Sequence, residues 1–307
     1  MIIEERNEVM KLIIEAIRGF CMALADSVPG VSGGTIAFIL GFYDNFIKSL
    51  NNLIYGKMEE KKDAIKYLMK LGIGWIIGMI LAILILTSLF ESHIYSVSSV
   101  FLGFIIFSIP LIIKEEKSVL KGNYKNILFT IIGITIVASI TYFNPVSSSS
   151  SDINLANMDL KLVLYLFVSA MIAISAMVLP GISGSTLLLI FGVYIPVITA
   201  IKEFLHFNFA YFPALVVFGL GVLTGIILII KLVKMALEKQ RSKSIYTIIG
   251  LMIGSLYAIV MGPTTLEVAR DAMSFDTFSI IFFLLGGVII FGLDRLKVVL
   301  ENKANSK

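Results

Sequence analysis

Two short stretches, VPGVSGGT at 28–35 and LPGISGST at 179–186, place proline, glycine and hydroxyl residues inside runs that are otherwise apolar. Proline lacks an N–H and disfavours the helical conformation at the residue before it. The glycines that follow permit backbone angles that other residues avoid. Each stretch therefore predicts a helix that breaks, near Ser27 in the first copy, and a new helix that begins near Gly34 and is capped by Ser32.

The chemistry that such breaks support is anion binding. The N-terminus of a helix presents free N–H groups and the positive end of the helix dipole, and phosphate is a common guest there. Small residues could instead serve only close helix packing, but packing would need neither a proline nor a hydroxyl in both copies. The breaks are Pro29 and Pro180, and the candidate substrate-binding residues beside them are Ser27, Gly30, Ser32, Gly33, Gly34, Thr35, Gly181, Ser183, Gly184, Ser185 and Thr186.

Arg18 and Asp26 are charged residues in a segment that is otherwise apolar from residue 17 to residue 43. Ionisable residues inside a membrane are costly and point to function. We expect Arg18 to neutralise a substrate anion and Asp26 to bind a coupling ion, with H⁺ and Na⁺ as the candidates. A direct pair between them is disfavoured, because eight residues of helix separate them by ~12 Å. Arg18 could also extend to the membrane surface. Asp44 is expected to be an interfacial charge.

These residues belong to a chain whose composition is that of an integral membrane protein. It has 307 residues, of which 58% are hydrophobic, well above the share in soluble domains. Several uncharged runs reach the ~20 residues that a membrane helix needs. One cysteine and two histidines offer no metal site, no cofactor is indicated, and no paired carboxylates or activated nucleophile suggest an enzyme. The net charge of +4 reflects loop placement and does not indicate nucleic acid binding.

Lysine and arginine gather in alternate connections of the chain. They lie at both ends and at 48–70, 114–125 and 231–243, whereas 144–161 has only Lys161. By the positive-inside rule the basic connections are cytoplasmic. We therefore expect a multi-pass protein of the bacterial cytoplasmic membrane with both termini in the cytoplasm.

The chain also repeats itself. Aligning 28–50 with 179–201 gives nine identical positions among 23, including proline, glycine, serine and tyrosine, with Tyr43 matching Tyr194 and Gly41 matching Gly192. Further along, Gly72, Gly74 and Gly78 match Gly219, Gly221 and Gly225. We interpret these later glycines as helix-packing positions.

The repeat and the charges together predict an all-α fold of two inverted repeats, each a broken hairpin followed by three transmembrane helices. An inverted repeat is typical of secondary transporters. We favour re-entrant hairpins over fully spanning ones; charge counting alone allows both. The first repeat is 1–146, with a hairpin at 11–50 and spans at 67–90, 95–113 and 126–144. A Ser-rich external linker follows at 147–160. The second repeat is 161–307, with a hairpin at 161–201 and spans at 210–233, 245–262 and 276–294.

The stretches ADSVPGVSGGTIAFILGFYDNFI (25–47) and LPGISGSTLLLIFGVY (179–194) resemble a bacterial and archaeal membrane family, formerly of unknown function and now associated with polyprenyl-phosphate transport (PopT). The resemblance covers nearly the whole chain. It implies that the cargo is undecaprenyl phosphate, moved from the outer to the inner leaflet for reuse in cell-wall synthesis. Ser185 departs from Gly34 of the first copy, so the two anion sites need not be equivalent.

This resemblance fits the anion site, because the cargo has a phosphate head and an apolar tail that can stay in lipid. Without it, two hypotheses remain equal: a lipid-phosphate carrier and a secondary transporter for a small soluble anion. A third, a membrane enzyme or scaffold acting on lipid intermediates, is disfavoured by the missing catalytic residues. The sequence is silent on the oligomeric state, the cargo chain length and the energy source.

Overall fold

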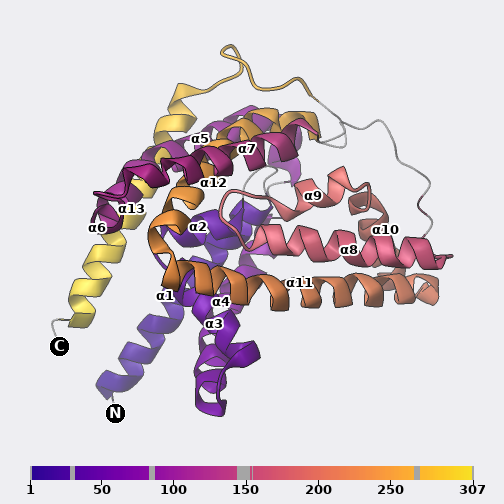
Figure 1. Ribbon diagram of the computed structural model, residues 1–307, viewed down its shortest axis with the longest axis horizontal. Helices are drawn as coiled ribbons and strands as arrows, with labels where there is room; N and C mark the ends of the chain where they lie inside the picture. The colour runs from indigo at the N-terminus through magenta and orange to yellow at the C-terminus, as the bar shows by residue number, and fades with distance from the viewer. Residues whose placement is uncertain are drawn as a thin grey trace.

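The computed structural model describes residues 2–27, 32–82, 87–143, 153, 155–265 and 270–305, and every regular element in these ranges is a helix (Figure 1). The first half contains α1 (Ile2–Asp26), α2 (Gly33–Ile39), α3 (Tyr43–Tyr55), α4 (Met58–Leu81), α5 (Thr87–Glu115), α6 (Lys117–Leu120), η2 (Tyr124–Asn126) and α7 (Ile127–Tyr142). The second contains α8 (Leu160–Met177), α9 (Gly184–Ile190), α10 (Tyr194–Leu205), η3 (Phe209–Tyr211), α11 (Phe212–Lys239), α12 (Arg241–Met261), η4 (Gly262–Thr265) and α13 (Ile280–Asn305).

Six helices in the described residues are long and apolar enough to cross a membrane. They are Met58–Leu81, His93–Glu115, Tyr124–Tyr142, Leu160–Met177, Phe209–Lys239 and Arg241–Thr264. The backbone of α5 leaves helical angles at His93. The apolar span of this helix begins at the same residue. Large apolar side chains on α4, α7 and α11 are exposed, including Ile76, Ile131 and Leu228, as expected where lipid replaces water. The protein is therefore an all-α, multi-pass membrane protein.

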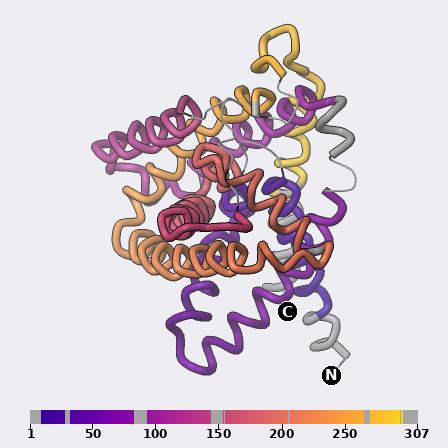
Figure 2. The backbone as a smooth tube through the Cα atoms, turned by 90° about the vertical axis from the view of Figure 1, so that its right-hand side faces the viewer, coloured from indigo at the N-terminus to yellow at the C-terminus, as the bar shows by residue number. Residues whose placement is uncertain are grey.

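The long helices pair in the same way in both halves. α1 packs along α4 and α8 packs along α11, while α5 pairs with α13 and α7 with α12. Figure 1 shows α8 and α11 lying side by side over most of their length. The start of α1 and the end of α13 lie on the same side of the molecule (Figure 1), and the hairpin of α3 and α4 protrudes at the bottom of both views (Figures 1 and 2).

Glycines set the closeness of these pairs. A Cβ on Gly74 would lie 1.8 Å from the Ala16 carbonyl oxygen, and one on Gly221 would lie 2.5 Å from that of Phe167. The packing interpretation therefore holds for Gly74 and its counterpart, and it holds likewise for Gly78 and Gly225. It is wrong for Gly72 and Gly219, where an added Cβ would have no neighbour within 4 Å; these two face outward from the helix pair.

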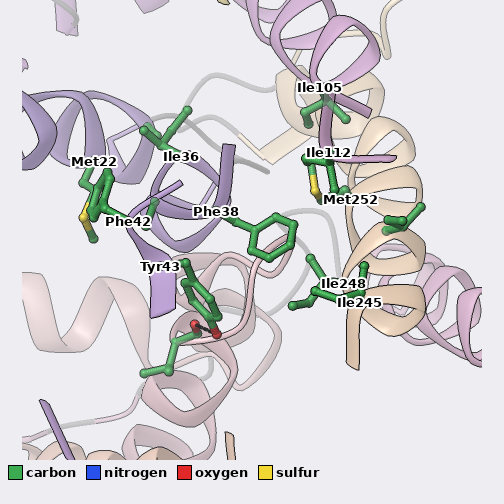
Figure 3. Packing of buried hydrophobic residues seen from close by; sticks show 14 of the residues in the cluster. Met22, Ile36, Phe38, Phe42, Tyr43, Ile105, Ile112, Ile245, Ile248 and Met252 are labelled. Atoms are coloured by element: carbon green, nitrogen blue, oxygen red, sulfur yellow. Dashed lines mark hydrogen bonds between the residues drawn. The ribbon is translucent and has the colours of Figure 1, made fainter. Parts of the chain in front are cut away.

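The main core lies between the first hairpin and the pair α5 and α12. Figure 3 shows the Phe38 ring of the hairpin lying between Tyr43 and the α5 and α12 residues Ile112, Ile248 and Met252. Tyr43 is 1% exposed and Met252 is fully buried. The first hairpin is thus anchored in the centre of the protein, where α2 and the start of α3 are packed on several sides.

Each hairpin contains a second turn that the sequence analysis did not predict. We expected one continuous helix after each proline-glycine break. Instead, the arm is split at residues 40–42 in the first half and 191–193 in the second, and α9 and α10 meet at 105°. Gly41 and Gly192 make the turns with φ of 70° and 65°, a left-handed conformation that strongly favours glycine. Their identity in the two copies was the signal for this turn.

One ion network joins the two halves. Arg241, the first residue of α12, donates from Nη1 to Asp44 Oδ2 at 2.7 Å. The same guanidinium binds both carboxylate oxygens of Glu116, with Nε 3.2 Å from Oε2. Asp44 is exposed, as expected for an interfacial charge, but it also ties the start of α3 to α12.

Candidate functional site

The first proline-glycine break ends with a capped helix. Ser32 has extended backbone angles, and its Oγ accepts a hydrogen bond from the Gly34 N–H at 3.2 Å. This is the arrangement of a serine N-cap, and it confirms the cap that the sequence predicts. Ser32 and Gly33 are buried. Pro29 and Gly30 lie outside the described residues.

The carboxylate of Asp26 also lies at this helix start. Its Oδ1 accepts the Gly33 N–H at 2.7 Å, and its Oδ2 accepts the indole N–H of Trp75 at 3.1 Å. Trp75 belongs to α4, so one carboxylate connects the end of α1, the start of α2 and the side of α4. The N–H group that we expected to be free for a substrate anion is thus bound by the protein's own carboxylate.

The second break has a different polar arrangement at the equivalent place. Ser183 occupies the N-cap position of α9 without a side-chain bond to the backbone. Its Oγ lies 2.8 Å from Ser185 Oγ. Gly181 has a φ of 90°, and a Cβ there would lie 2.5 Å from the Leu251 carbonyl oxygen. The two breaks are therefore not equivalent, as the Gly34-to-Ser185 difference suggested.

Met177 takes the position in the second break that Asp26 takes in the first. A Cβ on Gly33 would meet the Asp26 carboxylate at 2.7 Å, and a Cβ on Gly184 would meet Met177 Cβ at 3.1 Å and Sδ at 3.2 Å. A thioether thus lies where the first half has a carboxylate.

The two breaks touch each other. The Gly181 N–H donates to Thr35 Oγ1 at 2.7 Å, and the Tyr43 hydroxyl donates to the Val178 carbonyl oxygen at 3.0 Å. Ser32 Oγ lies 3.4 Å from the Met177 carbonyl oxygen. Residues about 145 positions apart therefore form one polar centre inside an apolar protein. Tyr43 was not among the predicted site residues, although its match to Tyr194 marked it.

Arg18 lies near this centre but is already paired. Its Nη1 donates to Glu15 Oε1 at 2.7 Å, and its guanidinium lies over the Phe42 ring, 5.2 Å from the ring centre. Its side chain is 20% exposed. The partner Glu15 was missed by the sequence analysis, although a separation of three residues places both side chains on one face of a helix. Glu15 Oε2 is buried, and the buried Tyr67 hydroxyl interacts with the same carboxylate.

The remaining predicted residues lie at the two breaks with more limited contacts. Ser27 Oγ donates to the carbonyl oxygen of Leu24 in its own helix at 2.7 Å. Pro180 and Gly184 are buried, and Thr186 is half-buried in the first turn of α9. Within the described ranges, no three His, Cys, Asp or Glu side chains gather in a way that could hold a metal ion.

The chain is similar to known proteins over most of its length. Residues 22–277 match a family model described as VCA0040-like, undecaprenyl phosphate translocase-like. A protein of Staphylococcus aureus named polyprenyl-phosphate transporter is 35% identical over 288 residues, which are 92% of this chain and 96% of that protein. A protein of Vibrio cholerae with the same name is 29% identical over 271 residues, 85% of this chain and 82% of its own. No solved structure matches the chain.

Proposed function

Because the chain belongs to the undecaprenyl phosphate translocase-like family, we propose that it carries undecaprenyl phosphate across the bacterial cytoplasmic membrane. The direction is from the outer to the inner leaflet, which returns the lipid for cell-wall synthesis. The observation that carries the proposal is the contact between the two breaks, through Thr35 and Gly181 and through Tyr43 and Val178. Non-helical backbone at membrane depth is tolerated where it is buried in protein or lines a polar cavity.

The architecture of the carrier is an inverted repeat. In the repeat, α1 corresponds to α8, α4 to α11, α5 to α12 and α7 to α13. With this correspondence the contact of α1 with α4 matches that of α8 with α11, and the contact of α5 with α13 matches that of α12 with α7. The glycines that leave no room for a Cβ, Gly74 and Gly221, occupy matching positions of α4 and α11, and so do Gly72 and Gly219, which have open space. Both observations support a two-fold relation, and the alternation of basic connections favours opposite orientations in the membrane, with both termini in the cytoplasm.

The phosphate binds at the two breaks near the membrane midplane. Its partners there are the predicted hydroxyls and N–H groups of 32–34 and 183–186, with Arg18 as the cation. Asp26 holds the first of these N–H groups at 2.7 Å, so phosphate binding displaces its carboxylate. This displacement links phosphate binding to Asp26 as the ion-coupling residue.

Arg18→Ala should lower lipid exchange about tenfold or more, because a hydrogen bond to a charged group contributes ~1.5–3 kcal/mol. The assay uses purified protein in liposomes with fluorescent undecaprenyl phosphate and a membrane-impermeant quencher. The same change also removes the cation that pairs with Glu15, so the double variant Glu15→Gln/Arg18→Ala is the matched control. Exchange that stays low in the double variant supports phosphate binding by Arg18. Recovery there would mean that Arg18 only neutralises Glu15.

Asp26→Asn should retain exchange but lose its response to a pH gradient, because an amide can still accept the Gly33 N–H but cannot carry a proton. The measurement compares exchange with and without the gradient for both proteins. An Asp26→Asn protein that responds as the unchanged protein does would remove Asp26 from ion coupling. Absence of lipid exchange in the unchanged protein under every gradient would instead favour a transporter of a small soluble anion.

A further inference from the structure

Side chains of the first hairpin satisfy backbone groups of the second break. Thr35 Oγ1 accepts the Gly181 N–H at 2.7 Å, and the Tyr43 hydroxyl donates to the Val178 carbonyl oxygen at 3.0 Å. We call these two hydrogen bonds the inter-break contact. Thr35 and Tyr43 are each 1% exposed, so water does not compete for either bond.

The backbone groups in this contact have no helical partners. α8 ends at Met177, and Val178 is its C-cap. Carbonyl groups in the last turn of a helix lack intrahelical donors, and Pro180 favours the end of α8 at this point. Gly181 then leaves helical geometry at a φ of 90°. The end of α8 thus leaves the Val178 carbonyl and the Gly181 N–H without helical partners, and Tyr43 and Thr35 of the other half bind them.

The position of Tyr43 is fixed by the second turn of the first hairpin. Gly41 turns the chain with a φ of 70°, and Tyr43 begins α3 two residues later. Its ring packs edge-on against Phe38, with ring centres 5.8 Å apart (Figure 3). The next residue, Asp44, binds Arg241 of α12. Any displacement of α2 and α3 therefore acts on the second break through Tyr43 and Thr35.

We propose that Thr35 and Tyr43 are positioning residues that couple the two breaks, so that a movement of one hairpin is passed to the other during transport. This role rests on the proposed lipid-phosphate transport. It assigns Thr35 to the partner break, where the sequence analysis placed it among the substrate-binding residues. Tyr43 contributes to transport through its hydrogen bond to Val178 and does not contact the lipid.

The test compares Tyr43→Phe and Thr35→Val with Tyr246→Phe. Tyr246 is the matched control, because its buried hydroxyl also donates to a carbonyl oxygen, that of Leu120 at 3.3 Å, away from the breaks. Phenylalanine keeps the ring packing against Phe38 and removes one hydroxyl. We expect the maximal exchange rate of Tyr43→Phe and Thr35→Val to fall roughly tenfold, because each variant removes one of the two hydrogen bonds that pass movement between the breaks. The lipid concentration at half-maximal rate should not change.

The double variant Thr35→Val/Tyr43→Phe should be little slower than either single variant, because both bonds serve one coupling. Tyr246→Phe should exchange lipid at the unchanged protein's rate. A rise in the half-maximal lipid concentration would place Thr35 in substrate binding and overturn the proposal. Normal rates in Tyr43→Phe, or an equal loss in Tyr246→Phe, would also overturn it.

Amide hydrogen exchange at Gly181 tests the contact without any transport. Thr35→Val should speed exchange of the Gly181 amide, because its acceptor is lost, whereas Tyr246→Phe should leave it unchanged. Unaltered exchange at Gly181 in Thr35→Val would overturn the contact itself. If the unchanged protein moves no lipid but Gly181 responds as expected, the proposed cargo fails while the coupling of the breaks stands.

Discussion

Gly33→Ala should slow lipid exchange strongly while leaving the fold intact. A Cβ at this position would lie 2.7 and 2.8 Å from the two carboxylate oxygens of Asp26. These atoms are the far end of a side chain, so the carboxylate can swing away without any shift of the backbone. The Gly33 N–H then loses its partner, and the helix start loses the geometry in which phosphate would replace Asp26.

We expect exchange to fall about tenfold or more in Gly33→Ala, comparable with the loss of a charge-assisted hydrogen bond of ~1.5–3 kcal/mol. The melting temperature should change little, because alanine recovers up to ~1 kcal/mol of helix propensity. Both quantities are measured on the same purified protein. The double variant Asp26→Asn/Gly33→Ala should be no worse than Gly33→Ala. A further loss in the double variant would show that the methyl group acts through something other than Asp26.

Gly74→Ala should unfold or strongly destabilise the protein, because its new methyl group has no room. The Cβ would lie 1.8 Å from the Ala16 carbonyl oxygen of α1, and backbone atoms cannot move aside as the Asp26 side chain can. Overpacking costs ~1–3 kcal/mol and sometimes more, and we expect ~3 kcal/mol or more here. The measurement is the thermal or denaturant midpoint in detergent.

The control for Gly74→Ala lies two residues earlier on the same helix. Gly72→Ala adds the same methyl group where no atom lies within 4 Å, and it should be neutral or stabilise by up to ~1 kcal/mol. The second half offers the same comparison in Gly221→Ala, which would meet Phe167, and Gly219→Ala, which has open space. Equal midpoints for Gly72→Ala and Gly74→Ala would contradict the close approach of α1 and α4.

The positions of the breaks could be predicted because their causes are local. Proline removes a donor, glycine widens the allowed angles and serine caps the next helix, and all three effects act within a few residues of Pro180 or Ser32. The helix-packing glycines were predictable only in part. Gly72 and Gly74 belong to one pattern, yet only Gly74 faces α1, and the facing side of a helix depends on its neighbours.

What could not be predicted is which groups meet across the fold. Trp75 reaches Asp26 over 49 positions, and Thr35 reaches Gly181 over 146; no local pattern encodes such pairs. The helix N-terminus at the first break was predicted correctly, but its Gly33 N–H is bound by Asp26 and is not free for an anion. Arg18 was correctly kept apart from Asp26, yet its partner Glu15 lies just before the stretch 17–43 in which charged residues were sought.

Trp75 has a consequence for spectroscopy. It is the only tryptophan in the chain, and its indole N–H donates to the carboxylate that caps the first break. All tryptophan fluorescence of the purified protein therefore originates beside Asp26. A cargo that displaces this carboxylate would change the emission maximum and the quantum yield of a single emitter, so occupancy of the first break can be followed in real time with no label attached.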